Sequence, residues 1–312
     1  AITFTNKAAG EMKERIRRML DFSGVFPWVS TFHSFCLRML RKHISELGFS
    51  NDFAVFDSQD QLVLVKQCMK AAQVSTDAFP PKSILNHISG FKNDFVLPEQ
   101  LDLDTMSYGN QMKAAELYLP YQAALKSNNA LDFDDLLSFT AKLFQQVPSL
   151  REYYDRKFQH ILVDEFQDTN AVQYELVRLL SRDTNNICVV GDPDQSIYSW
   201  RHADPSNLTD FQSTFNETKI VTLDQSYRST QIILEAADSV IGNNDERMEK
   251  NLWTENDRGS RITVAEAYNE EEEARLVLQA TVELQEKHGI DRNEIAVMYR
   301  VNAQSRAFEV TC

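Results

Sequence analysis

A short apolar run ends in two adjacent carboxylates near the middle of the chain. Ile161, Leu162 and Val163 directly precede Asp164 and Glu165. A run of three large apolar residues is typical of a strand that is buried on both faces in a parallel sheet. Ligands of parallel sheets bind just beyond the carboxyl ends of the strands. The segment therefore predicts an α/β fold with Asp164 and Glu165 at the edge where nucleotide-hydrolysing enzymes hold magnesium and water.

A second apolar run follows the same pattern further along the chain. Residues 187–190 are apolar and lead into a polar turn that contains Asp192 and Gln195. If the two strands are neighbours, they bring these side chains to one edge together with Asp164 and Glu165. One carboxylate can then hold magnesium, usually through water, while the other accepts a proton from attacking water. The alternative is that the acidic residues only cap the helices that follow.

Apolar periodicity predicts an alternation of strands and helices in the second half of the chain. The expected strands cover residues 161–163, 187–190, 220–223, 262–265 and 295–299, and the expected helices cover 172–180, 231–241 and 271–288. The first half is expected to begin with a strand over 1–5 and to continue with helices over 8–20, 32–47, 61–72, 112–126 and 134–146. Alternating strands and helices favour parallel βα architecture.

The composition limits the kind of protein and its surface. The chain has 312 residues and a formal charge of −14, so any nucleic-acid binding must be confined to a local groove. Part of the acid lies in residues 270–273, which we interpret as the first turn of a helix rather than as an acidic binding patch. No apolar stretch has the roughly 20 residues that a membrane span needs. The four scattered cysteines favour a reducing, cytoplasmic compartment and no structural zinc.

Seven segments occur in an order that is typical of one enzyme family. They are TFTNKAA (3–9), STFHSF (30–35), LDFDDLL (131–137), DEFQDTN (164–170), GDPDQSIYSWR (191–201), QSYRST (225–230) and YRVNAQSR (299–306). The chain resembles UvrD/Rep/PcrA-type superfamily 1 DNA helicases in these segments, which run from near its first residue to near its last. The resemblance implies an ATP-dependent enzyme that moves along single-stranded DNA in the 3′ to 5′ direction and unwinds duplex.

The resemblance also implies a set of residues that act on ATP. Asp164 would coordinate Mg²⁺, and Glu165 would be the catalytic base. Gln195 would sense the γ-phosphate. Arg228 would neutralise the charge that develops on the transferred phosphoryl group, and Tyr227 would stack on the adenine. For Tyr227 and Arg228 the alternative is an ordinary surface turn after a strand.

A second implied set of residues contacts DNA. Phe4, Tyr198 and Trp200 would stack on bases, which suits a motor that must accept any sequence. The residues implied in phosphate or sugar contacts are Thr5, Asn6, Thr31, His33 and Arg201. Phe4 could instead belong to the core, His33 could be an ordinary histidine at the start of a helix, and Trp200 could be a core tryptophan.

Three acidic residues lie close together in the LDFDDLL segment. Asp132, Asp134 and Asp135 could suggest a metal cluster. We favour a helix N-cap followed by an acidic first turn, because a carboxylate there accepts hydrogen bonds from free backbone N–H groups and complements the helix dipole.

The expected domains follow from the resemblance. A RecA-like P-loop NTPase motor domain would cover residues 1–43 and 154–219, a helical insertion would cover 44–153, and an incomplete second RecA-like domain would cover 220–312. The phosphate-binding sequence Gly-x-x-x-x-Gly-Lys-Ser/Thr does not occur. The family places it upstream of the first strand of this chain, so we expect an internal fragment that is inactive as an ATPase by itself.

The expected partners are nucleic acids and proteins, and no membrane partner is expected. They are single-stranded DNA, junctions between single and double strands, and repair or replication proteins, with nucleoid association if the source is bacterial. Two alternatives to a helicase remain open at this point. The chain could be a non-catalytic piece that binds single-stranded DNA or a partner, or it could be the motor part of a helicase–nuclease.

Overall fold

The computed structural model describes residues 1–20, 26–244 and 250–311. The described residues form two compact units. We call residues 1–221 the N-terminal unit and residues 222–311 the C-terminal unit, in each case without the gaps just given. Each unit is treated by itself below. Cys312 lies outside the described residues.

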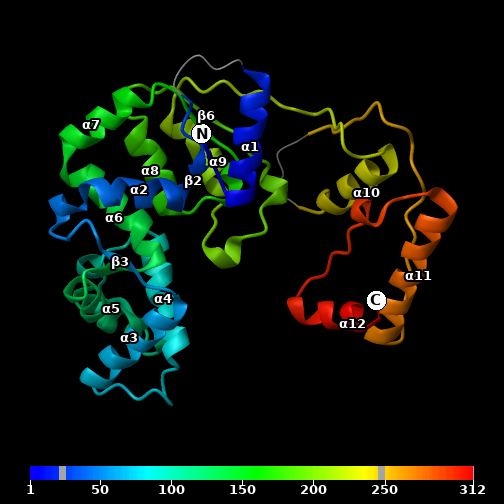
Figure 1. Cartoon of the computed structure of the whole chain (residues 1–312). Helices are drawn as coiled ribbons and strands as arrows, with labels where there is room; N and C mark the ends of the chain where they lie inside the picture. The colour runs from blue at the N-terminus through cyan, green and yellow to red at the C-terminus, as the bar shows by residue number, and fades with distance from the viewer. Residues whose placement is uncertain (21–25, 245–249, 312) are drawn as a thin grey trace. The chain divides into compact units, whose positions relative to one another are not determined.

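A parallel sheet lies at the centre of the N-terminal unit (Figure 1). Its order is β2 (Ser30–Thr31), β1 (Ile2–Thr3), β5 (Ile161–Val163) and β6 (Ile187–Val189). All three pairings are parallel. The predicted strands at 161–163 and 187–190 are therefore confirmed as neighbours, and the mixed α/β fold class is confirmed with them.

The prediction that β5 is buried on both faces is wrong. Ile161 and Val163 are 7% and 1% exposed, whereas Leu162 is 48% exposed. Successive side chains of a strand point to opposite faces. Ile161 and Val163 lie in the main core, so helices cover that face of β5 while the face of Leu162 stays open.

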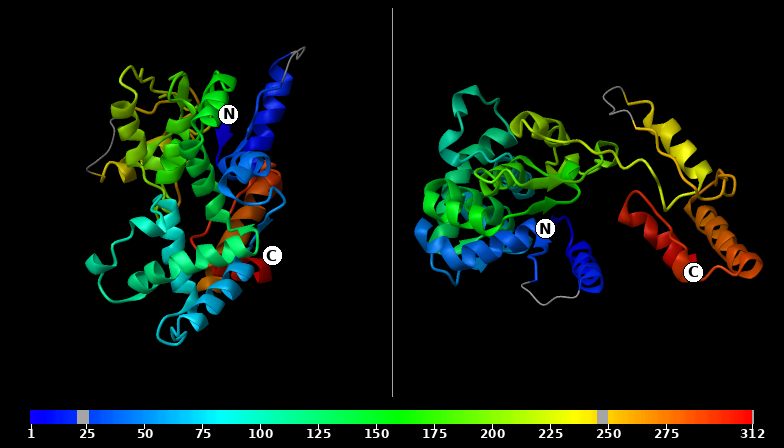
Figure 2. Two further views of the ribbon diagram at one scale, coloured as in Figure 1. Left: turned by 90° about the vertical axis from the view of Figure 1, so that its left-hand side faces the viewer. Right: turned by 90° about the horizontal axis from the view of Figure 1, so that it is seen from above.

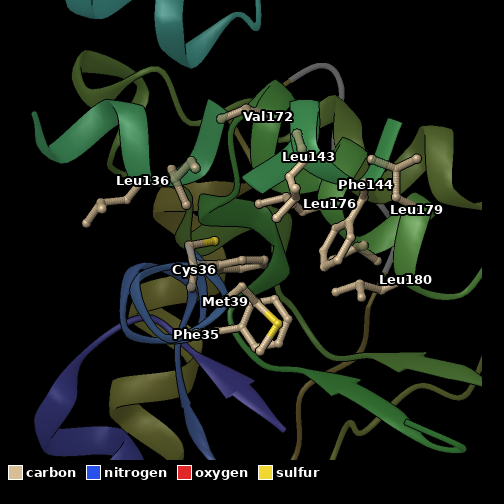
Figure 3. Close-up of a cluster of buried hydrophobic side chains, with 14 of the residues drawn as sticks. Phe35, Cys36, Met39, Leu136, Leu143, Phe144, Val172, Leu176, Leu179 and Leu180 are labelled. Atoms are coloured by element: carbon tan, nitrogen blue, oxygen red, sulfur yellow. The ribbon is translucent and has the colours of Figure 1, made fainter. Parts of the chain in front are cut away.

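The main core joins the sheet to four helices. These are α2 (Phe32–His43), α6 (Phe133–Gln146), α7 (Pro148–Lys157) and α8 (Ala171–Leu180). Figure 3 shows apolar side chains of α2, α6 and α8 meeting around Cys36 and Met39, which are 0% and 1% exposed. The predicted helix over 32–47 ends earlier, at His43, because a 3₁₀ turn (η1, Ile44–Leu47) follows it and Gly48 ends that turn with a φ of 77°. Glycine adopts this left-handed conformation without a steric cost.

Two further helices flank the sheet. Helix α1 (Asn6–Met19) begins where the Thr5 side chain accepts a hydrogen bond from the backbone N–H of Ala8. Helix α9 (Ser206–Thr214) was not predicted, and it contributes Phe211 to the core. Helix α1 buries little of its surface, with Ala9 as its buried residue.

A helical lobe with its own core belongs to the same unit (Figure 1). Its helices are α3 (Ser58–Ala71), α4 (Pro81–Asn93) and α5 (Asn110–Ser127), with the 3₁₀ turns η2 (Pro98–Gln100) and η3 (Leu103–Thr105) between α4 and α5. The chain enters and leaves the lobe through two short parallel strands, β3 (Ala54–Val55) and β4 (Ala130–Leu131). The sequence did not predict this strand pair, because each strand has only two residues and pairs with a distant one.

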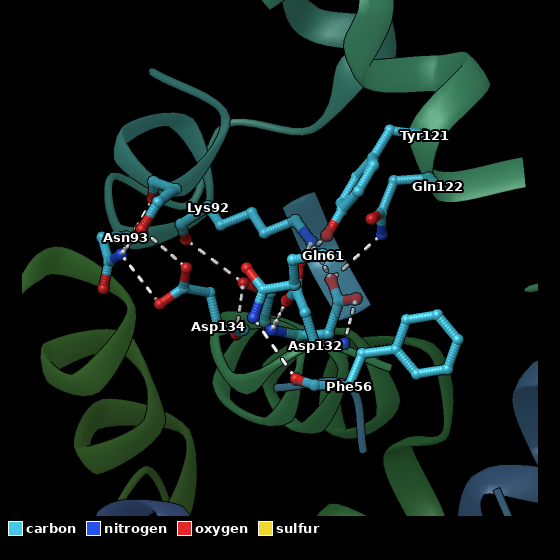
Figure 4. Close-up of polar contacts among 11 residues, drawn as sticks. Phe56, Gln61, Lys92, Asn93, Tyr121, Gln122, Asp132 and Asp134 are labelled. Atoms are coloured by element: carbon cyan, nitrogen blue, oxygen red, sulfur yellow. Dashed lines mark hydrogen bonds and ion pairs between the residues drawn. The ribbon is translucent and has the colours of Figure 1, made fainter. Parts of the chain in front are cut away.

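A buried lysine of α4 lies between acidic residues at the start of α6 (Figure 4). Lys92 Nζ lies 2.5 Å from Asp132 Oδ2 and 2.7 Å from Asp135 Oδ1. The hydroxyl of Tyr121 also donates to Asp132, at 3.1 Å. Asp132 caps the N-terminus of α6, and its side chain accepts from the backbone N–H of Asp135. The helix-cap interpretation of the acidic cluster is therefore confirmed.

Burial and charge oppose each other in this lysine cluster. The pKa of Asp135 is raised to about 7, because burial and then the charge of Asp132 raise it more than the charge of Lys92 lowers it. Burial alone would lower the pKa of Lys92, but the two carboxylates outweigh it and raise this pKa above its usual value. The cluster therefore depends on the ammonium group, which compensates two buried acids.

The C-terminal unit is mostly helical in the residues that are described. It contains α10 (Gln231–Ile241), α11 (Glu270–His288) and α12 (Ser305–Thr311), with 3₁₀ turns η7 (Arg292–Glu294) and η8 (Asn302–Gln304) (Figure 2). The predicted bounds of α10 agree with the structure, and α11 begins with the acidic first turn expected at residues 270–273. No helix among the described residues is long and apolar enough to cross a membrane.

The strands predicted at 220–223, 262–265 and 295–299 are wrong. In the residues described for these ranges the backbone is irregular, and Leu223, Val264 and Met298 are 79%, 92% and 92% exposed. A strand needs a neighbouring strand for its backbone hydrogen bonds. The described part of this unit offers one isolated bridge, between Gln225 and Trp253, and the apolar runs have no other pairing.

Replacing Lys92 tests how much the N-terminal unit depends on the lysine cluster. We expect Lys92→Met to lower the free energy of unfolding by about 3–5 kcal/mol at pH 8, because Asp132 and Asp135 lose their counter-charge inside the fold. The matched control is Lys66→Met, at an exposed lysine of the same lobe, which should change stability by less than about 0.5 kcal/mol. Urea unfolding gives both values.

The loss should depend on pH in a defined direction. Folded Asp135, with a pKa of about 7, holds a proton that the unfolded chain releases above about pH 4. The contribution of Asp135 to the free energy of unfolding is therefore lost as the pH rises from about 4 to 7. Lys92→Met should accordingly lower the free energy of unfolding less at pH 5 than at pH 8. Equal stability of Lys92→Met and the unmodified chain would show that the cluster contributes nothing.

Candidate functional site

Asp164 and Glu165 follow β5 in a bent stretch of backbone. The backbone N–H of Asp164 still donates to the carbonyl of Ile2 in β1, at 2.9 Å. Glu165 has left-handed dihedral angles, φ 55° and ψ 44°, which are uncommon for a residue with a side chain. The chain then turns into η4 (Phe166–Asp168), and Phe166 N–H donates to Val190 of the next segment at 2.9 Å. The turn directs the two carboxylates away from the core.

Burial and the charge of Glu165 raise the pKa of two neighbouring carboxyl groups. Burial raises the pKa of Asp164, and the charge of Glu165 raises it further. The pKa of Asp168 is raised to about 6 by the same two causes in the same order. Asp168 is buried, and its Oδ1 has no hydrogen-bond partner among the described residues. The sequence did not point to Asp168, which differs from an ordinary capping acid only through its burial.

The loop after β6 holds Gln195 near Asp192. Gln195 lies in η5 (Pro193–Gln195), and its Nε2 donates to Asp192 Oδ2 at 2.8 Å. The other oxygen of Asp192 accepts from the backbone N–H of Asp194 at 3.0 Å. Because β5 and β6 are parallel neighbours, Gln195 follows the carboxyl end of the strand beside the one that ends in Asp164 and Glu165. The geometry thus places the four polar side chains after two adjacent strands, as expected.

Aromatic residues in the segments after β1 and β6 form a cluster with an arginine. The rings of Phe4 and Tyr198 stack with centroids 5.2 Å apart, and the rings of Tyr198 and Trp200 lie 6.2 Å apart. The guanidinium of Arg201 lies 4.4 Å from the centre of the Trp200 ring. Trp200 is 65% exposed, which contradicts the alternative of a core tryptophan. Trp200 and Arg201 belong to η6 (Ser199–Arg201). We call Phe4, Tyr198, Trp200 and Arg201 the aromatic cluster.

Thr5, Asn6 and Thr31 lie at the first turns of α1 and α2. Thr5 and Thr31 are the N-caps of these helices, so their side-chain oxygens already accept backbone hydrogen bonds. Ser34 connects them, because it accepts from the Thr31 hydroxyl at 3.0 Å and donates to Asn6 Oδ1 at 3.5 Å. Thr31 is 7% exposed. A DNA phosphate at this place would therefore meet helix N-termini and the exposed Asn6 rather than a free Thr31 hydroxyl.

His33 stacks on an aromatic residue that the sequence did not single out. Its ring lies 3.9 Å from the ring of Phe133, with 16° between the planes. Burial lowers the pKa of His33 to about 4. The imidazole is therefore neutral at physiological pH, and any contact with DNA would be a stacking or hydrogen-bonding contact rather than a charged one. Phe133 is 53% exposed.

Tyr227 and Arg228 belong to the C-terminal unit and lie in an exposed turn. The Tyr227 hydroxyl donates to Gln225 at 2.8 Å, and the Tyr227 side chain is 81% exposed. The turn is attached to the segment around Trp253, because Ser226 N–H donates to the Trp253 carbonyl at 2.7 Å. No sequence motif connected Trp253 with this turn.

The donor set fits magnesium better than a metal held by protein ligands alone. The described residues contain no group of three or more His, Cys, Asp or Glu side chains that could hold a metal ion. Asp164 and Glu165 provide adjacent carboxylates, and Mg²⁺ in nucleotide enzymes commonly takes one or two carboxylates and keeps water and phosphate oxygens as its other ligands. The arrangement is consistent with a magnesium ion that arrives with a nucleotide.

Comparison with known proteins places the whole chain in one family. Residues 1–216 match the UvrD/REP helicase N-terminal domain, and residues 221–311 match the UvrD-like helicase C-terminal domain. The chain therefore belongs to the UvrD-like helicase family.

The curated relatives are named as helicases. The chain is 44% identical over 311 residues to the ATP-dependent DNA helicase PcrA of Staphylococcus aureus (strain NCTC 8325) and 45% identical over 311 residues to that of Bacillus subtilis (strain 168). Each alignment covers 100% of this chain and 42% of the relative. The chain thus spans less than half the length of the relatives that it matches.

A titration of His33 tests the stacked arrangement. We expect its ring to stay neutral down to about pH 5, because the folded pKa is about 4 while an exposed histidine has a pKa of about 6.5. Between about pH 4 and 6.5 the histidine binds a proton in the unfolded chain but not in the folded chain. The contribution of His33 to the free energy of unfolding therefore falls as the pH drops from about 6.5 to 4. The matched variant Phe133→Ala uncovers the ring and should raise the pKa toward 6.5. NMR of the imidazole protons gives both values, and a midpoint near 6.5 in the unmodified protein would contradict the burial of His33.

Proposed function

We propose that this chain carries part of an ATP-driven motor that moves along single-stranded DNA in the 3′ to 5′ direction and separates duplex strands. One observation carries the proposal. The polar residues Asp164, Glu165 and Gln195 follow adjacent parallel strands, and the segment that holds Gln195 continues directly into the aromatic cluster. A nucleotide site and a base-stacking site would then share one loop. Family membership and the names of the relatives support the same function.

The residues after β5 and β6 would act on the terminal phosphate of ATP. Bound Mg²⁺ would polarise the γ-phosphate and neutralise its charge. Asp164 would hold that ion, directly or through water. Glu165 would orient the attacking water and accept its proton, and Gln195 would bond to the γ-phosphate.

Two residues of the C-terminal unit complete the proposed ATP set. Arg228 would balance the charge that develops on the transferred phosphoryl group, and Tyr227 would stack on the adenine ring. This assignment rests on the motif that they share with the family. Their exposure leaves both side chains accessible to a ligand.

The aromatic cluster and the N-termini of α1 and α2 would bind the DNA strand. Phe4, Tyr198 and Trp200 would stack on bases, which is independent of sequence because every base has a flat face. Arg201 and Asn6 would contact phosphates, with Thr5, Thr31 and His33 shaping the helix starts beside them. The proposal includes junctions between single and double strands as substrates and repair or replication proteins as partners. It also includes association with the nucleoid. A non-catalytic DNA-binding role would need only the aromatic cluster.

Replacing Glu165 separates a motor from a non-catalytic binder. In the full-length protein, we expect Glu165→Gln to lower DNA-stimulated ATP turnover by about 10²–10⁴-fold. ATP affinity should stay unchanged, because the substitution removes only the general base. Glu46→Gln, at an exposed glutamate of η1, is the control and should keep full turnover. Phosphate release and nucleotide binding are measured on the same samples. Normal turnover of Glu165→Gln would rule out its role as the base.

Trp200 and Arg201 should differ in how their loss depends on salt. Trp200→Ala should weaken single-strand binding by about 1–3 kcal/mol with little change in the salt slope, because stacking releases few counterions. Arg201→Gln should reduce the slope of log K against log salt by about one unit. Tyr108→Ala removes another exposed aromatic residue, 75% exposed in the helical lobe, and should leave binding intact. Unchanged binding by Trp200→Ala, with an unchanged melting temperature, would remove Trp200 from the DNA site.

A further inference from the structure

Gln167 is a buried residue that connects the two strand ends of the candidate site. It lies in η4, two residues after Glu165, and is 1% exposed. Its Nε2 donates to Glu165 Oε2 at 2.8 Å, and its Oε1 accepts from the backbone N–H of Asp192 at 3.0 Å. A single side-chain amide thus joins the acid after β5 to the loop after β6.

The chemistry of its neighbours fixes which way the amide points. A carboxylate only accepts hydrogen bonds, so the group facing Glu165 must be the NH₂. A backbone N–H only donates, so the group facing Asp192 must be the oxygen. Rotating the amide by half a turn would break both hydrogen bonds. Two acceptors would then face each other at Glu165, and two donors would face each other at Asp192. The donor and acceptor groups of the two neighbours therefore determine the orientation of the amide.

Gly191 confirms how closely the amide approaches β6. A Cβ placed on Gly191 would lie 2.7 Å from Gln167 Oε1 and 3.2 Å from the backbone nitrogens of Gln167 and Phe166. Only a residue without a side chain leaves room for the amide at this position. Gly191 and Gln167 therefore pack closely against each other across the two segments. A methyl group on Gly191 should displace the Gln167 amide.

Glu165 needs such support because its own backbone does not provide it. Its dihedral angles are left-handed, and its side chain is exposed at the edge of the sheet. An exposed glutamate samples several rotamers, and a general base must stay within hydrogen-bond reach of the attacking water. The hydrogen bond from Gln167 restricts one carboxylate oxygen and leaves the other available.

We propose that Gln167 is the positioning residue for Glu165 and that it makes the position of this base depend on the loop from Asp192 to Arg201. The proposal rests on the proposed role of Glu165 as the general base. The side chain of Asp192 also accepts from Gln195, so movement of this loop reaches Gln195 and Gln167 together. Binding of a DNA base to the aromatic cluster would then act on the base through Gln167.

Two substitutions at Gln167 separate its two hydrogen bonds. Gln167→Met keeps the length of the side chain and removes both bonds. We expect it to lower kcat by about 10–100-fold and to reduce the ratio of turnover with and without an oligothymidine strand, while ATP affinity is kept. Gln167→Glu keeps an acceptor for Asp192 but places a carboxylate beside Glu165. Because this variant no longer donates a hydrogen bond to Glu165, the DNA-dependent ratio should also fall in it.

The pH profile of Gln167→Glu gives a readout that a merely structural role would not move. A second carboxylate at this distance disfavours the charged form of Glu165, which must be charged to accept a proton. The acidic limb of the kcat profile should therefore shift upward by about 1 pH unit. The matched control is Gln173→Glu, at a 5% exposed glutamine of α8 whose oxygen accepts from Asn170 N–H instead. Its pH profile should not change.

Gly191→Ala tests the same contact from the segment after β6. The added methyl group should displace the Gln167 amide and lower kcat as Gln167→Met does. It also provides a second test if Gln167→Met does not fold. The double variant Glu165→Gln with Gln167→Met should be no slower than Glu165→Gln alone, because Gln167 acts through Glu165.

The outcomes distinguish this proposal from the proposed function. If Glu165→Gln lowers turnover but Gln167→Glu and Gly191→Ala keep normal kcat and an unshifted pH profile, the positioning role is wrong and the helicase function stands. Additive losses in the double variant would likewise overturn it. If Glu165→Gln itself retains turnover, the general-base assignment fails first and the role of Gln167 fails with it.

Discussion

The parallel order β2-β1-β5-β6 is the constraint on which the candidate site depends. Parallel strands end at the same edge of a sheet, so whatever follows each strand meets the residues that follow its neighbours. Phe4 follows β1, His33 follows β2, Glu165 follows β5 and Tyr198 follows β6. A nucleotide site and a DNA site can share this edge only because the strands run in one direction. An antiparallel neighbour would carry its loop to the opposite edge.

Helix α4 connects the helical lobe to the same edge. Asn93 accepts a hydrogen bond from the side chain of Asn170, the N-cap of α8, at 2.6 Å. Gly90 lies against the ring of His202, where a Cβ would be only 3.1 Å away. The same helix carries Lys92, whose ammonium group compensates the acids that start α6. The lobe is therefore joined to the segment after β5 by a hydrogen bond and to the segment after β6 by the close approach of Gly90 and His202.

Local signals predicted the helices better than the strands. The bounds of α10 were predicted without error, and α11 differs by one residue at its start, because apolar periodicity and capping are read from nearby residues. Strand pairing is a non-local property. The apolar run 262–265 has strand composition, but composition does not say which segment would pair with it. Leu162 shows the same limit, since an apolar run cannot tell whether helices cover one face of a strand or both.

The candidate site was predictable as a set of segments but not as a set of contacts. The motifs named Glu165, Gln195 and Trp200, and the sheet brings their segments together. The hydrogen bonds of Gln167 depend on a left-handed turn and on a glycine in the segment after β6, which no local pattern encodes. The stack of His33 on Phe133 joins residues far apart in the chain. Phe4 is neither a core residue nor fully exposed. It is half-buried and stacks on Tyr198, which in turn lies beside the exposed Trp200. An aromatic residue held on one side by the protein keeps its ring oriented, so a base that stacks there meets a surface that is already ordered.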